Sequence, residues 1–368
     1  GTFNAITVYP GRELDSNYSM NTVDLCPVGA LTSKDFRFKM RVWFLKETKT
    51  IDVDCGTGTN ITLWTREDKV YRITPRQNDA VNSCWMPDSH RLNYKYINAE
   101  TRIPQPVIRT DAEAPHRPST WEPALASAAE AVKRIAPNQL AIIASGRMTN
   151  EELYMVRHLA AQIGTDMVDI VPRMGESDGM LISADRNPNT NGARLVLDIE
   201  PGSRLDAIRE GVRSGSIKGI LSLGEDLISP EAGFTAEDLD KLDYLFMTAH
   251  SANETARHAD LVLPGVTYAE KFGTMINVTG RIQRLNRAIQ PIGYARDDWQ
   301  IFRDITLLLG GNPALKDFNS ALDILTAMST EYGALNGVSW GSIGDGGQPI
   351  LETGVTIPVV EREKNQGR

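Results

Sequence analysis

The chain has 368 residues, of which 41% are hydrophobic and 23% are charged, and its formal net charge is −8. This composition is that of a globular protein long enough for two or three domains, and the acidic balance argues against nucleic acid as a partner. No apolar run reaches the roughly 18–20 residues that cross a bilayer, and no secretory signal pattern is visible. Three cysteines are too few for a disulfide framework, which favours a reducing, cytoplasmic-type compartment.

The first 50 residues contain a cysteine followed by a proline. The sequence LCPVGAL at residues 25–31 is typical of the last ligand of a ferredoxin-type [4Fe–4S] cluster, which needs four thiolates. The other three ligands usually lie upstream, but no cysteine precedes Cys26 in this chain. Farther along, residues 35–45 (DFRFKMRVWFL) predict a strand or extended segment that lies against a partner surface.

Residues 51–105 are predicted to form a small β-rich module. ITLWTR at residues 61–66 and VYRITP at residues 70–75 flank the polar tripeptide EDK, which predicts strand, turn and strand. A segment with four prolines follows at residues 103–118, and we expect a linker and a domain boundary there.

From residue 121 onward, helical and strand patterns alternate. WEPALASAAEAVKRI predicts an amphipathic helix, and Thr149 with Glu152 predicts the capping box of a second helix, which stops at Gly164. The apolar runs LAIIAS, DMVDIV, RLVLDI, IKGILSLG, DYLFMTA and ADLVLP predict buried strands. The alternation predicts an α/β domain with a doubly wound parallel sheet over residues 106–310. Residues 311–368 are expected to form one helix, at residues 320–332, and an extended glycine-rich tail.

Several ordered segments resemble one family. YSMNTVDLCPVGALTSKDFRFKMRVW resembles the G subunit, the large iron–sulfur subunit, of NADH–quinone oxidoreductase, which is respiratory complex I. WEPAL, SGRMTNEELY, NPNTNGA and ETARHADLVLPGVTYAEKFGTMINVTGRIQ resemble the molybdopterin-oxidoreductase domain that this subunit shares with formate dehydrogenases. The resemblance covers residues 1 to about 310 and implies a molybdopterin-oxidoreductase-like fold preceded by a small, degenerate iron–sulfur module.

The resemblance also implies a role in electron transfer from NADH through iron–sulfur clusters to quinone. The implied place is the peripheral arm of the complex, at the cytoplasmic face of the plasma membrane. Other subunits of that arm would be the partners, and the membrane would be reached only through the complex. In the family, an N-terminal ferredoxin-type part supplies the other cluster ligands. That part is missing here, so residues 1–50 are interpreted as the end of that ferredoxin-type domain, and Cys26 is expected to share a [4Fe–4S] cluster with protein outside this chain.

A second cluster site of the family is expected to have lost its ligands. In IDVDCGTGTN, the first three ligand positions of the family motif fall on Asp52, Cys55 and Thr59, and the fourth position falls on Pro87. Only one of the four residues is a cysteine, so we expect a degenerate module without a cluster.

The molybdenum site of catalytic relatives is expected to be lost as well. Gly175 stands where those relatives have the metal-ligating cysteine or selenocysteine, and Glu176 stands where they have a histidine. No molybdenum and no catalytic residue are therefore expected in this chain. The alternative is a molybdenum or tungsten oxidoreductase of the formate dehydrogenase type, which would need a metal ligand that Gly175 does not provide.

Pterin binding without metal is a third hypothesis. The segment that passes the nucleotide part of the cofactor in catalytic relatives contains Gly273, Thr274, Asn277, Gly280 and Arg281. The helix start at Thr149 and Asn150 could also receive a phosphate. We favour a role of these residues in turns and packing. The five histidines show no spacing typical of metal ligands.

Overall fold

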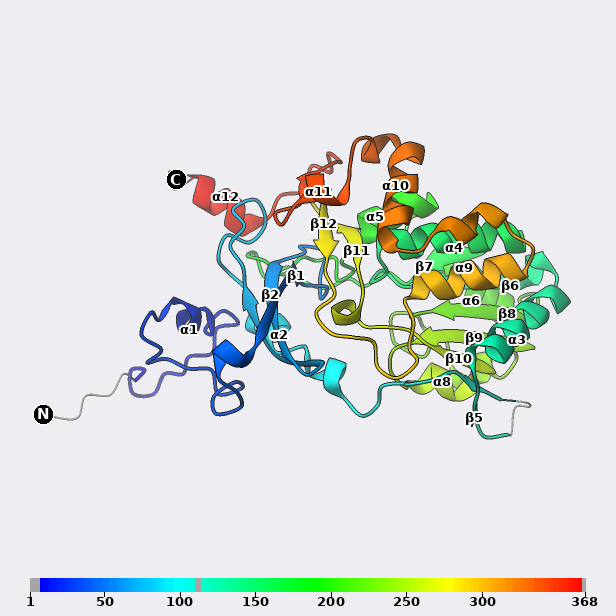
Figure 1. Ribbon diagram of the computed structural model, residues 1–368, viewed down its shortest axis with the longest axis horizontal. Helices are drawn as coiled ribbons and strands as arrows, with labels where there is room; N and C mark the ends of the chain where they lie inside the picture. The colour runs from blue at the N-terminus through cyan, green and yellow to red at the C-terminus, as the bar shows by residue number, and fades with distance from the viewer. Residues whose placement is uncertain (1–6, 110–113, 366–368) are drawn as a thin grey trace, which may run out of the picture.

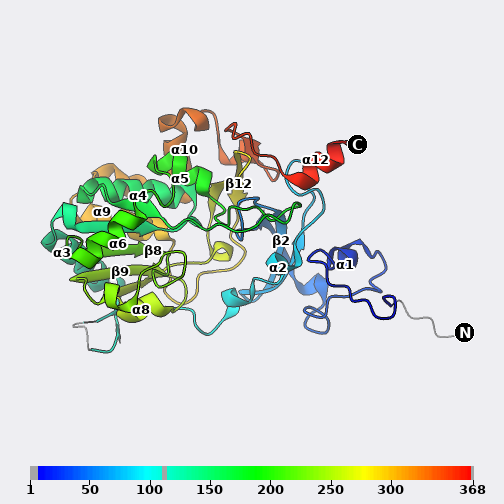
Figure 2. The ribbon, with the colours of Figure 1, turned by 180° about the vertical axis from the view of Figure 1, so that it is seen from behind.

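A computed structural model describes residues 7–109 and 114–365. Figures 1 and 2 show an N-terminal segment at one end of the molecule, a small β-sheet beside it, and a larger α/β body at the other end. The last helix, α12 (Pro358–Asn365), lies back near the small β-sheet. In the described ranges, no helix combines the length and the hydropathy needed to span a membrane.

The N-terminal segment has little regular structure of its own. It contains the short helix α1 (Asn21–Leu25) and the 3-10 turn η1 (Val42–Phe44). The predicted strand at residues 35–45 is wrong, because this stretch forms turns that lie across the β-module. The Arg72 guanidinium lies 4.7 Å from the Phe36 ring and 4.4 Å from the Trp64 ring, so aromatic contacts with arginine replace a backbone ladder here.

The β-module is an antiparallel sheet in the order β1–β2–β3. Its strands are β1 (Lys46–Ile51), β2 (Asn60–Arg66) and β3 (Lys69–Pro75), so the predicted strand–turn–strand is confirmed. Glu67 and Asp68 join the last two strands with φ values of 50° and 55°, the geometry of a two-residue hairpin turn. Strand β1 starts at Lys46, so this sheet reaches across residue 50. The turns α2 (Asp88–Arg91) and η2 (Lys95–Asn98) follow the sheet.

The α/β body is built on a seven-stranded sheet in the order β5–β4–β10–β9–β8–β6–β7. Five of its strands are parallel, which confirms the predicted doubly wound sheet. They are β6 (Leu140–Ala144), β7 (Val168–Ile170), β8 (Gly219–Leu223), β9 (Tyr244–Ala249) and β10 (Leu261–Pro264). Their chain order across the sheet is 2-1-3-4-5, so the order reverses between β6 and β8.

Two short strands extend this sheet at one edge. The predicted proline linker contributes β4 (Val107–Ile108) and β5 (Arg117–Pro118), which pair antiparallel beside β10. Proline is tolerated here because an edge strand needs fewer backbone donors. The linker is therefore partly built into the α/β body.

Helices cover both faces of the sheet. One face carries α3 (Trp121–Arg134), α4 (Asn150–Ile163), α5 (Thr190–Leu197), α9 (Asp298–Leu308) and α10 (Ala321–Glu331). The opposite face carries α6 (Leu205–Ser214), α7 (Ala236–Leu239) and α8 (Glu254–His258). The predicted strand RLVLDI is wrong, because most of that run belongs to α5. The apolar side of this helix packs into the core between the sheet and the helices on its first face. A short apolar run such as this one fits both a buried strand and a buried helix, and its periodicity does not distinguish between them.

A third small sheet joins the parts. It consists of β11 (Gly273–Ile276), β12 (Arg281–Leu285) and β13 (Gln348–Pro349). Apolar residues of β11 and β12 share one core with the β-module, including Ile61, Leu63 and Met275. The tail expected to be extended also contains α11 (Trp340–Ile343) and ends in α12, whose valines pack with Val81. The remaining turns are η3 (Pro137–Gln139), η4 (Tyr268–Glu270), η5 (Pro313–Asp317) and η6 (Gly333–Leu335).

Candidate iron–sulfur site at Cys26 and the degenerate sites beside it

Cys26 lies at the end of α1, in a turn whose backbone amides face its sulfur. The Leu31 amide donates a hydrogen bond to Cys26 Sγ over 3.5 Å. This bond, helped by the amides of residues 28–30, outweighs partial desolvation and lowers the pKa of the thiol. A lowered pKa favours the thiolate, which is the form that binds metals. Amide hydrogen bonds to sulfur are also a known influence on iron–sulfur clusters, so the turn is suited to a ligand thiolate.

Among the described residues, no group of three or more Cys, His, Asp or Glu side chains that could hold a metal includes Cys26. Cys55 and Cys84 both belong to the β-module, where Cys55 is buried and Cys84 is exposed, and all three cysteines are free. A [4Fe–4S] cluster needs four ligands, so a cluster at Cys26 would need further ligands from other protein.

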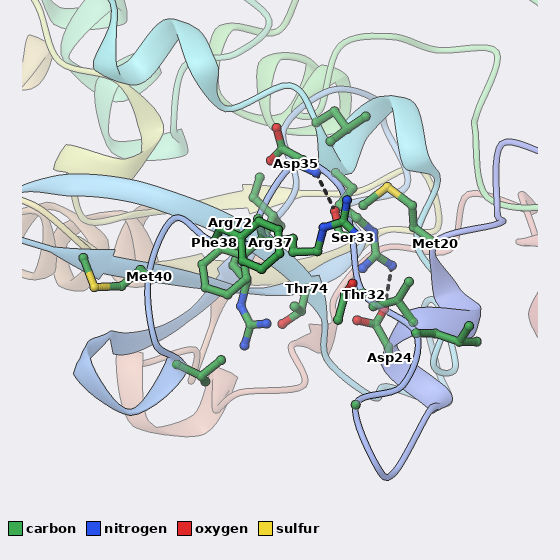
Figure 3. A pocket seen from close by; sticks show the side chains of 18 of the residues that line it. Met20, Asp24, Thr32, Ser33, Asp35, Arg37, Phe38, Met40, Arg72 and Thr74 are labelled. Atoms are coloured by element: carbon green, nitrogen blue, oxygen red, sulfur yellow. Dashed lines mark hydrogen bonds and ion pairs between the residues drawn. The ribbon is translucent and has the colours of Figure 1, made fainter. Parts of the chain in front are cut away.

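The surface around the Cys26 turn carries exposed apolar side chains. Val28 is 81% exposed, Phe38 94% and Trp43 73%. A hollow of about 450 Å³ opens between this turn and β3, with Arg72 and Met20 in its walls (Figure 3). Large exposed apolar side chains that gather into a patch mark interaction surfaces.

Polar contacts hold the segment in place against the β-module. Tyr94 donates a hydrogen bond to Asp35 over 2.6 Å, and Arg91 pairs with Asp24 over 2.7 Å. Side chains on both sides of Cys26 in the sequence therefore attach this segment to the β-module.

The family's second cluster site is filled by protein side chains in this chain. Asp52 and Thr59 face each other one position beyond the last pair of β1 and β2. The Asp52 amide donates a hydrogen bond to the Thr59 carbonyl over 2.8 Å. The Cys55 thiol is 1% exposed and lies 3.8 Å from the Leu181 carbonyl oxygen. Burial, with the nearby Asp52 charge, raises the pKa of Cys55 to about 11. Pro87 caps the start of α2. These side chains do not form the four-thiolate set that a cluster requires.

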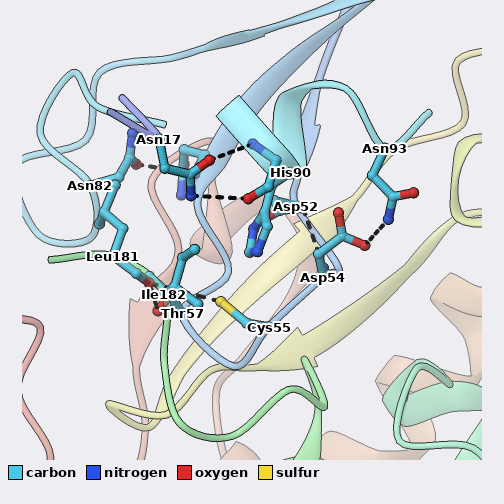
Figure 4. Close-up of polar contacts among 12 residues, drawn as sticks. Asn17, Asp52, Asp54, Cys55, Thr57, Asn82, His90, Asn93, Leu181 and Ile182 are labelled. Atoms are coloured by element: carbon cyan, nitrogen blue, oxygen red, sulfur yellow. Dashed lines mark hydrogen bonds and ion pairs between the residues drawn. The ribbon is translucent and has the colours of Figure 1, made fainter. Parts of the chain in front are cut away.

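A histidine that the sequence analysis did not single out reaches the same place. His90, on α2, lies with its Nδ1 atom 2.6 Å from Asp52 Oδ2, and Asp54 lies beside the pair (Figure 4). Burial opposes protonation of His90, but the charge and hydrogen bond of Asp52 outweigh it and raise the pKa of the imidazole. Burial and the Asp52 charge raise the pKa of Asp54 to about 7. In the sequence, the one local indication that His90 belongs to this site is its position three residues after Pro87.

The position of the molybdenum ligand does not fit a protein-ligated metal. Gly175 lies in an exposed segment after β7, and a Cβ atom placed on it would meet Arg186 Nε at 2.7 Å. Arg173 nearby binds both carboxylate oxygens of Glu225, through Nη1 over 2.9 Å and through Nη2 over 2.5 Å. Glycine itself offers no side-chain donor to a metal at this position.

A small crevice lies where the strand order reverses, the usual ligand position in doubly wound sheets. Its volume is about 100 Å³, and Ser145, His250, Lys271 and Asp298 are among its walls. Lys271 Nζ lies 2.8 Å from both carboxylate oxygens of Glu152. Burial, together with surrounding cationic side chains, lowers the pKa of His250 to about 4, so that imidazole is neutral near pH 7. One wall of this crevice is therefore a lysine whose charge is already paired inside the protein.

The segment considered for pterin binding uses its polar groups inside the protein. Thr274 donates through its amide and hydroxyl to Glu151, each over 2.8 Å. Asn277 Nδ2 donates to the Thr57 carbonyl over 3.0 Å, and Arg281 Nη1 donates to the Gly347 carbonyl over 2.8 Å.

Close backbone approach explains both glycines of this segment. A Cβ atom on Gly273 would lie 2.5 Å from a Thr149 methyl carbon. A Cβ atom on Gly280 would lie 2.2 Å from the Leu351 carbonyl oxygen, at a φ of +79°. The start of α4 is also served internally, since Glu152 accepts from the Thr149 amide in a capping box. These contacts account for the segment without a ligand.

Three family descriptions match separate parts of the chain. Residues 1–32 match the NADH-quinone oxidoreductase subunit 3, ferredoxin-like domain. Residues 45–95 match the NADH-ubiquinone oxidoreductase NDSU1/NuoG-like, 4Fe-4S domain, and residues 186–306 match the molybdopterin oxidoreductase family. The first match ends just beyond Cys26, and the second begins at the β-module.

Curated relatives match most of the chain. The 78 kDa subunit of mitochondrial NADH-ubiquinone oxidoreductase of Candida albicans is 27% identical over 432 residues, covering 86% of this chain and 60% of the relative. The G subunit of NADH-quinone oxidoreductase of Rickettsia prowazekii is 34% identical over 314 residues, covering 81% of this chain and 45% of the relative. The chain thus spans about half of the relatives' length. Among solved structures, acetylene hydratase from Pelobacter acetylenicus matches with a TM-score of 0.59 at 10% identity, over 80% of this chain and 73% of that one, and so shows a shared fold.

Proposed function

We propose that the chain is a member of the family of the large iron–sulfur subunit of NADH-quinone oxidoreductase and supports electron transfer in that complex, because its family matches and its curated relatives carry those names. In this proposal Cys26 is one of four thiolate ligands of a [4Fe–4S] cluster, and protein outside this chain supplies the other three. The observation that carries the proposal is the Cys26 turn, whose Leu31 amide faces the sulfur and lowers the pKa of the thiol.

The α/β body serves as a mount without redox chemistry of its own. Electron tunnelling weakens steeply with distance, so clusters must be held at set separations by a rigid body. The shared core of the β-module and the third sheet provides such rigidity, as does the buried pair of Arg102 and Glu270, whose side-chain atoms lie 2.6 Å apart. The lack of a donor at Gly175 supports a body without molybdenum.

The partners are other subunits of the peripheral arm, including the ferredoxin part that completes the cluster. Val28, Phe38 and Trp43 are exposed in the same N-terminal segment as Cys26, and such a part would cover apolar side chains of this segment. The chain would reach the membrane only through the complex, at its cytoplasmic face. The names of the curated relatives support association with the other subunits of the complex.

Assembly with the missing ligands tests the proposal. The chain is co-expressed with a polypeptide that carries the ferredoxin-type three-cysteine run, and iron, acid-labile sulfide and the EPR spectrum after reduction are measured. The Cys26→Ser variant is compared with Cys84→Ser, which changes an exposed cysteine of the β-module. We expect the cluster signal of the assembled pair to be lost in the first variant and kept in the second.

Two results would contradict the proposal. One is a cluster of unchanged iron content in the Cys26→Ser pair. The other is stoichiometric molybdenum or tungsten in the purified chain, which would favour an oxidoreductase of the formate dehydrogenase type instead.

A further inference from the structure

We propose that Asp52, Asp54 and His90 bind one divalent metal ion of the Zn²⁺ class in the β-module. The site would take the place of the family's second cluster with a different metal and different ligand atoms. It does not depend on Cys26 or on the electron-transfer role proposed above.

The three side chains already bring their donor atoms together. One ligand atom from each lies within 4.8 Å of the others. Tetrahedral Zn²⁺ with bonds near 2.1 Å needs ligand atoms about 3.4 Å apart, so small side-chain rotations close the set around one ion. The metal would take the place of the hydrogen that now bridges His90 Nδ1 and Asp52 Oδ2 over 2.6 Å. Two carboxylates and one imidazole leave a fourth position for water, as in open zinc sites.

Burial and charge favour a cation here. Asp52 and His90 are buried, and two carboxylates face one imidazole in this cluster. Arg147 and Arg186 act on the cluster through their charges, but neither forms an ion pair with Asp52 or Asp54 among the residues that the structure describes. A buried excess of negative charge is costly, and a divalent ion removes that cost.

A buried hydroxyl without a partner lies on the same face of the hairpin. Asp52 and Thr59 stand opposite each other in the extended register of β1 and β2, so their side chains project to the same side. Thr59 is 1% exposed, and its Oγ1 atom has no hydrogen-bond partner in the described chain. Buried polar atoms are nearly always satisfied, and a water ligand of the metal would provide the missing partner.

Neighbouring groups already orient the carboxylates. Asn93 donates to Asp54 Oδ1 over 2.8 Å, and the Asp54 amide donates to Asp52 Oδ1 over 3.2 Å. Such outer contacts are typical of metal ligands. The Cys55 thiol contacts the Leu181 carbonyl oxygen, so the proposed set consists of nitrogen and oxygen atoms without sulfur (Figure 4).

The test uses the full chain, freed of metal by chelator and titrated with Zn²⁺ in a calorimeter. Asp54→Asn and His90→Gln are compared with wild type. His158→Gln is the matched control, because it removes a histidine that lies on α4, far along the chain from the β-module. We expect one Zn²⁺ per chain, at least tenfold weaker binding in the two site variants, and unchanged binding in the control. Circular dichroism spectra and thermal midpoints show whether each variant is folded.

X-ray absorption of the zinc-loaded wild type gives a readout that needs no variant. A first shell of nitrogen and oxygen supports the site. A Zn–S distance near 2.3 Å, or loss of binding in Cys55→Ser with retention in Asp54→Asn, would replace it with a thiolate site and overturn the proposal. Absence of saturable binding to the wild-type chain would overturn it as well.

Discussion

Lys271 Nζ lies 2.8 Å from both carboxylate oxygens of Glu152, and both side chains are almost completely buried. Glu152 belongs to the first turn of α4, and Lys271 follows the turn η4, more than a hundred residues later. The pair therefore ties the N-terminal end of a core helix to the segment that leads into the third sheet. Lys271 of this pair lines the crevice at the reversal of strand order.

Replacing Glu152 with glutamine is expected to destabilise the protein by about 3–5 kcal/mol, because Lys271 would remain buried without the carboxylate that it contacts directly. Glutamine can still accept a hydrogen bond from the Thr149 amide, so the helix cap is kept. Urea denaturation measures the change. Glu200→Gln is the control, since Glu200 pairs with Arg194 at an exposed site, where a loss below about 1 kcal/mol is expected. Equal losses in both variants would contradict the argument.

The pH dependence of stability is expected to change in Glu151→Gln. Burial raises the pKa of Glu151 to about 7 in the folded protein, above its usual value of 4.5. The folded state then holds a proton that the unfolded state releases, so the stabilising contribution is complete below pH 4.5 and is lost as pH rises towards 7. The full loss is on the order of 3 kcal/mol.

The variant lacks this titration, so its stability relative to wild type should rise by that amount across the same window. Denaturation curves at several pH values between 4.5 and 8 provide the comparison. Glu130→Gln, at an exposed position of α3, should show no such trend. A Glu151→Gln curve parallel to that of wild type would refute the expectation.

The three cysteines are expected to react with iodoacetamide at different rates. Cys26 should react faster than the exposed Cys84 near pH 7, because the Leu31 amide lowers the pKa of its thiol. Cys55 should react only after unfolding, because it is buried and its thiol pKa is raised to about 11. Peptide mapping by mass spectrometry gives the three rates. A Cys26 rate below that of Cys84 would show that the amide turn does not activate the thiol.

Arg72→Lys is expected to loosen the N-terminal segment. Lysine keeps the charge but lacks the planar guanidinium that contacts the Phe36 and Trp64 rings. Each lost contact should cost about 0.5–1 kcal/mol of stability. Limited proteolysis should then cut faster between residues 8 and 45. Arg194→Lys, on the surface of α5, serves as control and should leave the cleavage pattern unchanged.

Much of the fold could be predicted because its signals are local. The hairpin of β2 and β3, the capping box at Thr149, and five of the six predicted strands of the α/β body are confirmed. RLVLDI failed because a short apolar run has no periodicity that separates a helix from a strand. Residues 35–45 failed because arginine–aromatic contacts with the β-module, rather than a backbone ladder, set their conformation.

The sequence by itself determined the family resemblance, the alternation of helices and strands, and the absence of cysteine at Asp52, Thr59 and Gly175, since each of these can be read from residue identity and order. Only the tertiary structure decided that His90 meets Asp52, and that Lys271 meets Glu152. It also decided that the Leu31 amide donates to the Cys26 sulfur. The physical reason is that charge compensation and burial depend on which segments pack together, and those segments are far apart in the chain.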